Sequence, residues 1–195
     1  MIVGIGGTTR PGSTSERALL FALAEARKLG ADTELLVGED ILLPIYVPEV
    51  LERNDTARHL VAVLRRASGI IVASPGYHGS LSGLIKNALD YAEDMRNDGL
   101  PYFESRAVGL IACANGWQAT GATLNALRSI VHALRGWPTP LGVAINTTEA
   151  HIGEDNVPVN PATRQQLSIL AAQVVQFAQQ RLAYLLAHAP AAITG

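Results

Sequence analysis

The stretch IVGIGGTTRPGSTSERALL, residues 2–20, decides the fold of this chain. Residues 2–5 form a short apolar run that predicts a strand. A helical pattern, with apolar residues at helical spacing, begins with Arg17-Ala18-Leu19-Leu20. A loop of glycine and small hydroxyl residues joins the two. Backbone N–H groups at the start of a helix lack partners, and the helix dipole is positive there. The stretch therefore predicts a loop that binds phosphate at a helix N-terminus.

The loop also supplies side-chain donors. Hydroxyl groups donate hydrogen bonds, and a guanidinium matches phosphate oxygens, so the candidate phosphate ligands are Thr8, Arg10, Ser13, Thr14 and Ser15. In the alternative interpretation, Ser13 or Ser15 only caps the helix and the glycines form the turn. Arg10 favours phosphate binding, because a plain cap has no use for a guanidinium. Which serine lies closer to the phosphate stays open.

The loop matches neither of two common nucleotide-binding motifs. No lysine occurs before Lys28, so the Gly-Lys-Ser/Thr ending of nucleoside triphosphate hydrolases is missing. Residues 4–10 supply only the first two glycines of G-x-G-x-x-G, although Glu34 could act as the ribose-binding acid of that fold. A phosphate monoester is therefore favoured over a triphosphate or a dinucleotide.

Composition predicts one domain over residues 1–195, because 48% hydrophobic residues can enclose a full core. The net charge of -2 disfavours nucleic acid as a partner.

The N-terminus has no basic leader, and its apolar run is too short for a signal peptide or membrane span, so we expect a cytoplasmic protein. The single cysteine, Cys113, allows no internal disulfide, and the five scattered histidines predict no metal site.

Hydrophobic patterning alternates between strands and helices along the whole chain. Strands are expected at residues 2–5, 33–37, 69–74, 107–113 and 141–145, and helices at 17–29, 57–67, 81–94, 122–134 and 161–188. We expect residues 42–48 to form a surface connection and residues 187–195 to form a frayed tail. This order predicts an α/β fold of flavodoxin-like type, a doubly wound five-stranded parallel sheet with helices on both faces and ligands at the carboxyl ends of the strands.

The loops after the third and fourth strands each contain glycines and one aromatic residue. Glycine frees backbone donors, and an aromatic face suits a planar heteroaromatic ring. Aromatic residues make up only 5% of the chain, so Tyr77 and Trp117 favour ring binding over ordinary loop packing. The candidate ring-binding residues are Pro75, Gly76, Tyr77, His78, Gly79 and Ser80 in one loop, and Asn115, Gly116, Trp117, Thr120 and Gly121 in the other.

These motifs together resemble the NAD(P)H-dependent FMN reductase family. The resemblance rests on residues 7–13, Leu43-Pro44, and residues 75–83 followed by Lys86-Asn87 and Asp90, with Thr8 where the family often has serine. It implies that residues 10–15 hold the FMN phosphate, that 75–80 line the isoalloxazine ring, and that 115–121 complete its pyrimidine side. It also implies NADPH or NADH as co-substrate and a homodimer or homotetramer.

The implied activity is an enzymatic one. Hydride passes from NAD(P)H to flavin N5 and then to a quinone, azo compound, metal ion, oxygen or free flavin, which requires no acid–base side chain, so no catalytic residue is named. We expect His78 to be solvated, Lys86 and Asp90 to form a surface pair, and Cys113 to be a packed thiol. The alternatives are a flavodoxin-like electron carrier, which would favour an acidic surface, and an interaction protein without flavin.

Two further expectations concern assembly and turnover. Met95, Leu100, Tyr102 and Phe103 are apolar groups in residues 91–104 that a monomer would leave wet, which favours a homo-oligomer. Family members that release reduced flavin carry a tyrosine inserted in the fourth helix, and this chain has no tyrosine between Thr120 and Leu134. The resemblance thus predicts that FMN stays bound through turnover.

Overall fold

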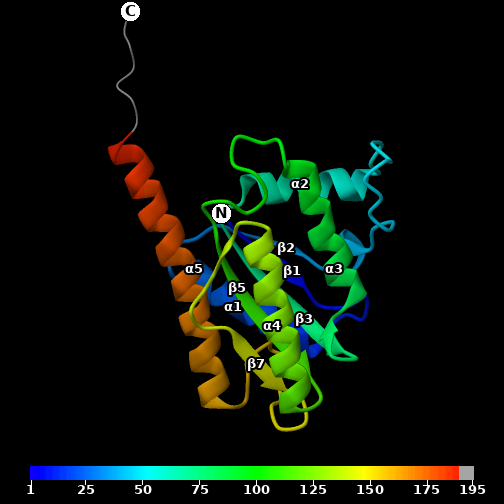
Figure 1. The fold of residues 1–195 in the computed structure, drawn as a ribbon. Helices are drawn as coiled ribbons and strands as arrows, with labels where there is room; N and C mark the ends of the chain where they lie inside the picture. The colour runs from blue at the N-terminus through cyan, green and yellow to red at the C-terminus, as the bar shows by residue number, and fades with distance from the viewer. Residues whose placement is uncertain (189–195) are drawn as a thin grey trace, which may run out of the picture.

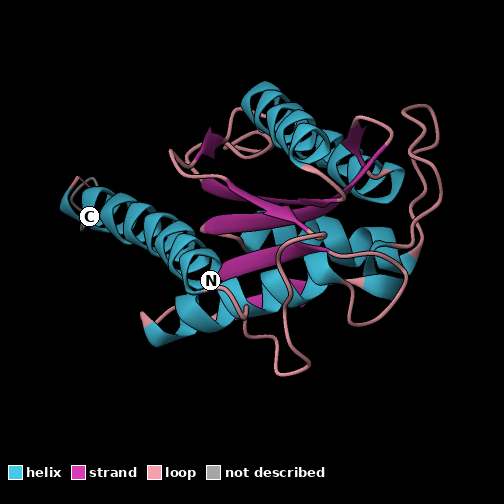
Figure 2. Cartoon of the chain, turned by 90° about the horizontal axis from the view of Figure 1, so that it is seen from below, coloured by secondary structure: helices cyan, strands magenta, loops and turns pink. Residues whose placement is uncertain are grey.

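The computed structural model describes residues 1–188, which form one twisted sheet between two layers of helices (Figures 1 and 2). The strands are β1 (Ile2–Gly6), β2 (Thr33–Leu36), β3 (Gly69–Tyr77), β4 (Ser80–Leu81), β5 (Ala107–Ala114), β6 (Trp137–Pro138) and β7 (Val143–Asn146). Strands run in the order β2-β1-β3-β5, and β6 and β7 pair in parallel along the far edge of β5. The predicted parallel, flavodoxin-like α/β sheet is confirmed.

Helices cover both faces of this sheet. They are α1 (Thr14–Lys28), α2 (Asp55–Arg66), α3 (Gly83–Asp90), α4 (Trp117–Ala133) and α5 (Pro161–Ala187), with 3₁₀ turns η1 (Gly38–Ile41) and η2 (Tyr91–Met95). Helices α1 and α5 bury one face, and α2, α3 and α4 bury the other. Successive residues of β3 point to opposite faces of the sheet: Ile70 and Val72 pack on the α2 side, and Ile71 and Ala73 pack on the α1 side.

The predicted count of five strands is wrong, since the described residues contain seven. Two strands, β6 and β7, pair with β5 in the region of the predicted fifth strand. The ladder is interrupted between them, because the Thr139 N–H donates to the Val108 carbonyl of β5 but the Leu141 N–H donates to Gln173 Oε1 instead. Strand β3 continues to Tyr77 and turns back through His78 (φ 49°) and Gly79 (φ 90°) into β4, which pairs antiparallel with it. Two left-handed residues form the two-residue turn of such a hairpin.

Several helix boundaries differ from the sequence prediction. Helix α1 begins at Thr14, three residues early, because Ser13 caps it, and the predicted helix 81–94 is α-helical only from Gly83 to Asp90, then 3₁₀. Helix α4 begins at Trp117 instead of residue 122. Gly116, at φ 106°, makes the sharp change of direction that starts it. Ala187 is still helical, and the rest of the predicted tail, 189–195, lies outside the described residues.

The segment that follows α3 packs within its own subunit. Met95 and Phe103 are fully buried, so the expectation that a monomer would leave them exposed to water is wrong for these two residues. Arg53 explains part of this burial, because its guanidinium donates to both carboxylate oxygens of Asp94, at 2.8 and 2.9 Å, and draws η2 onto the segment before α2. Leu100 remains 42% exposed. No helix within residues 1–188 is both long and apolar enough to cross a membrane.

Candidate functional site

The carboxyl ends of β1, β3, β5 and β7 meet at the lower edge of the sheet in Figure 1, and a cavity of about 410 Å³ opens there. It brings together the predicted phosphate loop and parts of both predicted ring-binding loops. Its lining residues are Thr8, Arg10, Ser13, Thr14, Ser15, Pro75, Gly76, Tyr77, Cys113, Ala114, Asn115 and Thr147. Residues predicted from three separate sequence motifs therefore face one space.

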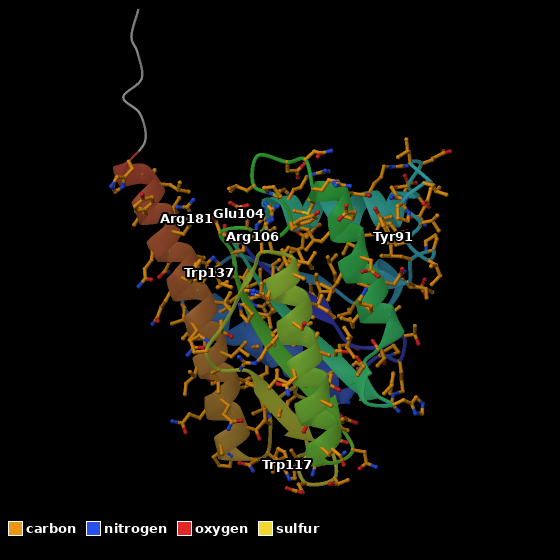
Figure 3. All side chains as sticks on the ribbon, in the orientation of Figure 1. Tyr91, Glu104, Arg106, Trp117, Trp137 and Arg181 are labelled. Atoms are coloured by element: carbon orange, nitrogen blue, oxygen red, sulfur yellow. The ribbon has the colours of Figure 1, made fainter. Side chains whose placement is uncertain are left out.

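A second cavity of about 420 Å³ lies beside the first and shares Asn115 with it. It is lined by Gly79, Asn115, Gly116, Trp117, Gln118, Ala119 and Ala122. Three more predicted residues, Gly79, Gly116 and Trp117, thus face this second space instead of the first. Figure 3 shows Trp117 at the start of α4, at the carboxyl ends of the strands and far from Trp137 and Arg106.

The remaining predicted residues line neither cavity. His78 is exposed in the β3–β4 turn, and Ser80 belongs to β4, where its carbonyl accepts a hydrogen bond from Thr123 Oγ1. Thr120 is fully buried, and its hydroxyl donates to the Trp117 carbonyl at 2.9 Å. Gly121 lies in the second turn of α4. These residues shape the loops and the start of α4, and their contact with a ligand stays a prediction.

The phosphate loop is held in shape by its own hydrogen bonds. Thr8 Oγ1 accepts from the Arg10 N–H at 3.0 Å and donates to the Arg10 carbonyl at 3.2 Å. A carboxylate oxygen of Glu16 accepts from the Gly12 N–H at 3.0 Å, and Arg17 Nε donates to the Gly12 carbonyl at 2.8 Å. These hydrogen bonds within the chain fix the shape of the loop.

Ser13 is the N-cap of α1, as the capping interpretation predicted. Its hydroxyl oxygen accepts from the Glu16 N–H at 3.3 Å and lies 3.4 Å from the Ser15 hydroxyl. A hydroxyl that accepts one bond still has a proton to donate, so capping does not exclude phosphate binding. Both serines are buried against the cavity, at 3% and 2% exposed.

Donors around this end of the cavity fit a phosphate group. Within residues 1–188, the backbone N–H groups of Thr14 and Ser15 have no acceptor, and Arg10 forms neither a hydrogen bond nor an ion pair through its guanidinium. Free amides at a positive helix end and an unpaired cation on the same wall favour a dianion. The donor set thus matches the terminal phosphate of FMN.

The two aromatic residues of the site keep their faces available. Tyr77 is 53% exposed and Trp117 is 58% exposed. Ordinary loop packing would bury these side chains, and neither is buried in the core. Between them, the end of β3 lies against the start of α4: a Cβ at Gly76 would come within 2.5 Å of Thr123 Oγ1 and 2.9 Å of Ala114 Cβ. A side chain at position 76 would therefore push the two loops apart.

The sequence prediction of the site lacked three residues of the first cavity: Ala114, Thr147 and Cys113, the last of which was expected to be a packed thiol. Burial does pack the Cys113 thiol, as predicted, and raises its pKa to about 12, so the thiol is neutral. Thr147 follows β7, and its N–H donates to the Ala114 carbonyl at 2.9 Å. The polar run Asn-Thr-Thr-Glu, residues 146–149 at the end of the last strand, was the signal that could have found it.

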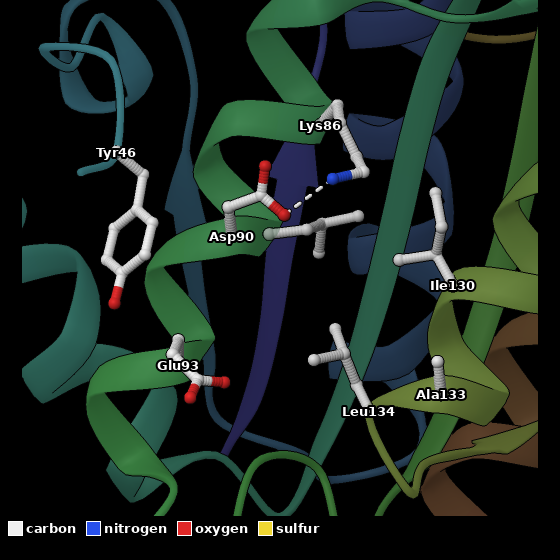
Figure 4. Close-up of a pocket in the computed structure, with 8 residues that line it drawn as sticks. Tyr46, Lys86, Asp90, Glu93, Ile130, Ala133 and Leu134 are labelled. Atoms are coloured by element: carbon white, nitrogen blue, oxygen red, sulfur yellow. Dashed lines mark hydrogen bonds and ion pairs between the residues drawn. The ribbon is translucent and has the colours of Figure 1, made fainter. Parts of the chain in front are cut away.

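The predicted pair of Lys86 and Asp90 lies elsewhere. Lys86 Nζ is 2.6 Å from an Asp90 carboxylate oxygen on the exposed face of α3, in a groove of about 320 Å³ between α3 and α4 (Figure 4). Within the part of the chain that the structure describes, no three His, Cys, Asp or Glu side chains gather as metal ligands would.

Comparison with known proteins agrees with this arrangement. An FMN-dependent NADPH-azoreductase of Staphylococcus aureus is 32% identical over 108 residues, 55% of this chain and 54% of that one. The chain thus spans about half the length of the curated relatives it matches. A flavoenzyme NAD(P)H:acceptor oxidoreductase of Paracoccus denitrificans has a TM-score of 0.74 at 19% identity, over 92% of this chain and 97% of that one. A flavodoxin, WrbA-like protein of Agrobacterium tumefaciens has a TM-score of 0.61 at 16% identity, over 92% and 97%.

A model of the NADPH-dependent FMN reductase family matches residues 1–150. This stretch runs from β1 past β7 and contains every residue that lines the first cavity. The family resemblance inferred from the motifs is confirmed by this match. The chain belongs to the NADPH-dependent FMN reductase family.

Proposed function

We propose that this chain is an NAD(P)H-dependent oxidoreductase that binds FMN in the first cavity and reduces a second, small-molecule acceptor. The acceptor would be a quinone, azo compound, metal ion, oxygen or free flavin. One observation carries the proposal: unsatisfied donors at the start of α1 and the free Arg10 guanidinium open into the same space as the ends of β3 and β5. When bound, FMN supplies the chemistry, because its ring accepts hydride at N5 and passes electrons on.

The protein's part is to bind and orient. Arg10 and the amides of Thr14 and Ser15, with the hydroxyls of Ser13 and Ser15, would hold the phosphate. Thr8, whose hydroxyl donates to the Arg10 carbonyl, would shape the loop around it. Pro75, Gly76 and Tyr77 would flank the ring on one side and Asn115 on the other, and Gly79, Gly116 and Trp117 would border its outer edge. His78, Ser80, Thr120 and Gly121 remain in the proposed site as residues that shape these loops. No side chain is assigned a catalytic proton transfer.

The spectrum of the purified protein tests this proposal. We expect FMN to bind in one-to-one ratio and its absorbance to bleach when NADPH or NADH is added without oxygen, then to return when a quinone or azo dye is added. Replacing Arg10 by alanine should weaken FMN binding with little change in stability, since Arg10 is exposed and its guanidinium forms no hydrogen bond or ion pair within residues 1–188. A protein that binds no FMN at micromolar concentration, or whose bound FMN is not bleached, contradicts the proposal.

We also propose that residues 1–195 act as one cytoplasmic domain, that nucleic acid and membranes are not partners, and that the chain forms a homodimer or homotetramer. Support for assembly now comes from the groove between α3 and α4, where Leu89, Ile130 and Leu134 form an apolar wall beside the Lys86–Asp90 pair (Figure 4). Light scattering at micromolar concentration tests it, and a monomeric mass contradicts it.

A further inference from the structure

A buried amide from the last strand ties together the loops at the second cavity. Asn146 ends β7 and is only 3% exposed. Its Oδ1 accepts hydrogen bonds from the Gly116 N–H at 2.8 Å, from the Thr148 hydroxyl at 2.8 Å and from the Thr148 N–H at 3.2 Å. Its Nδ2 donates to Glu149 Oε1 at 2.7 Å. One side chain thus fixes the peptide that starts α4 and, at the same time, orients the carboxylate of Glu149.

That carboxylate in turn holds an indole. Trp117 Nε1 donates to Glu149 Oε1 at 2.9 Å, the same oxygen that accepts from Asn146. With 58% of Trp117 exposed, its ring has little packing to hold it, and its N–H has no other acceptor within residues 1–188. The orientation of the ring therefore depends on the relay from Asn146 through Glu149.

The ring so oriented forms the one aromatic wall of the second cavity. The other lining residues are glycines, alanines, an asparagine and a glutamine, with no charged side chain among them. Such a space suits an uncharged, flat aromatic molecule, which gains from one fixed aromatic face and from close approach to small side chains. Because Asn115 lines both cavities, a molecule in the second lies next to a ring in the first.

We propose that Asn146 and Glu149 are positioning residues, which hold the Trp117 indole as the wall against which an uncharged aromatic acceptor stacks. This inference rests on the function proposed above, since it concerns the second substrate of that same site. It assigns Trp117 to the acceptor side, and the affinity for FMN should depend little on Glu149.

The test compares Glu149→Ala with Glu149→Gln, both made in a Trp137→Phe background so that Trp117 is the sole tryptophan. Glutamine keeps an oxygen that can accept from both Asn146 and Trp117, whereas alanine removes it. In E149A we expect Trp117 fluorescence to show lower anisotropy and stronger quenching by acrylamide than in the parent. E149Q should behave as the parent does. This readout needs neither FMN nor turnover.

Kinetics supply the second readout. The KM of E149A for an uncharged naphthoquinone should rise roughly 3- to 10-fold, the size of one net hydrogen bond, while the Kd for FMN changes less than about 3-fold. In a Trp117→Phe background, whose ring has no N–H, E149A should add no further change. Unchanged Trp117 fluorescence in E149A, or equal effects of E149A and E149Q, overturns the positioning role. Failure of the parent to bind FMN refutes the proposed function instead, and leaves the fluorescence result standing.

Discussion

Replacing Ser13 by aspartate separates phosphate binding from helix capping. Ser13 does two things in the structure: its hydroxyl accepts from the Glu16 N–H and caps α1, and it faces the first cavity. Aspartate is as good an N-cap residue as serine, so its carboxylate can accept from the same N–H. The substitution should therefore leave the free energy of unfolding within about 1 kcal/mol of the wild-type value.

The effect on FMN is expected to be large. The variant loses a hydroxyl donor to a charged group, which contributes about 1.5–3 kcal/mol. It also gains a negative charge beside the phosphate, and two unit charges at about 4 Å repel by up to about 4 kcal/mol at an effective dielectric constant near 20. With partial screening, the sum is at least about 3 kcal/mol, which weakens FMN binding by roughly 150-fold or more. Riboflavin has no phosphate and should lose little.

Fluorescence titration of the apoprotein with each flavin measures both losses, and urea unfolding checks stability. Arg10→Ala is the matched control, because it removes a phosphate donor without adding a charge and should cost FMN roughly 10- to 150-fold. If Ser13→Asp weakens riboflavin as much as FMN, the assignment of this loop to the phosphate is refuted.

Three further results are expected. Asp94→Asn should lower the free energy of unfolding at neutral pH by about 1–3 kcal/mol, because it leaves the half-buried Arg53 guanidinium without its carboxylate. Asp55→Asn, at an exposed pair, should cost under about 1 kcal/mol. The hydrogen bonds from Arg53 lower the pKa of Asp94 below 3.8, so the stabilisation by this ion pair is present above pH 3.8 and is lost as the pH falls through the lowered pKa. Urea unfolding from neutral to acid pH measures this loss, and an Asp94→Asn variant that is still destabilised in acid contradicts the ion pair. Because burial raises the pKa of Cys113 to about 12, the native protein should resist iodoacetamide at about pH 8 and react only in urea, and rapid labelling of native protein would disprove this burial. FMN should remain bound on desalting, with parallel double-reciprocal lines for NADPH against a quinone; intersecting lines that depend on added FMN indicate a flavin-releasing enzyme.

Local sequence was sufficient for the order of strands and helices, and it predicted residues that the structure brings together at the first cavity. Apolar runs such as those of β3 and β5 predict buried strands, and the glycine-hydroxyl loop before α1 predicts the anion site, because these signals lie within a few consecutive residues. Arg10 and Ser13 could be chosen from side-chain chemistry alone. The structure then places both on one cavity.

Features that depend on distant contacts could not be predicted. Met95 looked exposed because nothing in residues 91–104 shows that Arg53, 41 residues before Asp94, pulls this segment inward. Asn146 and Glu149 were missed for the same reason: their role depends on Gly116 and Trp117, about 30 residues earlier in the chain. Likewise, Gly116 and Gly121 suggested a loop where α4 in fact begins, since the Gly116 N–H that precedes the helix is held by the distant Asn146 side chain of β7.

The central claim is that the loop between β1 and α1 binds the phosphate of FMN, and the affinities of the wild-type apoprotein for FMN, riboflavin and FAD test it most directly. Calorimetric titration should give a micromolar or lower Kd for FMN, which corresponds to about 8 kcal/mol or more. Riboflavin, which lacks the phosphate, should bind at least about 100-fold more weakly, and FAD should bind more weakly than FMN because the loop is closed around a terminal phosphate. Equal affinity for FMN and riboflavin would contradict the account.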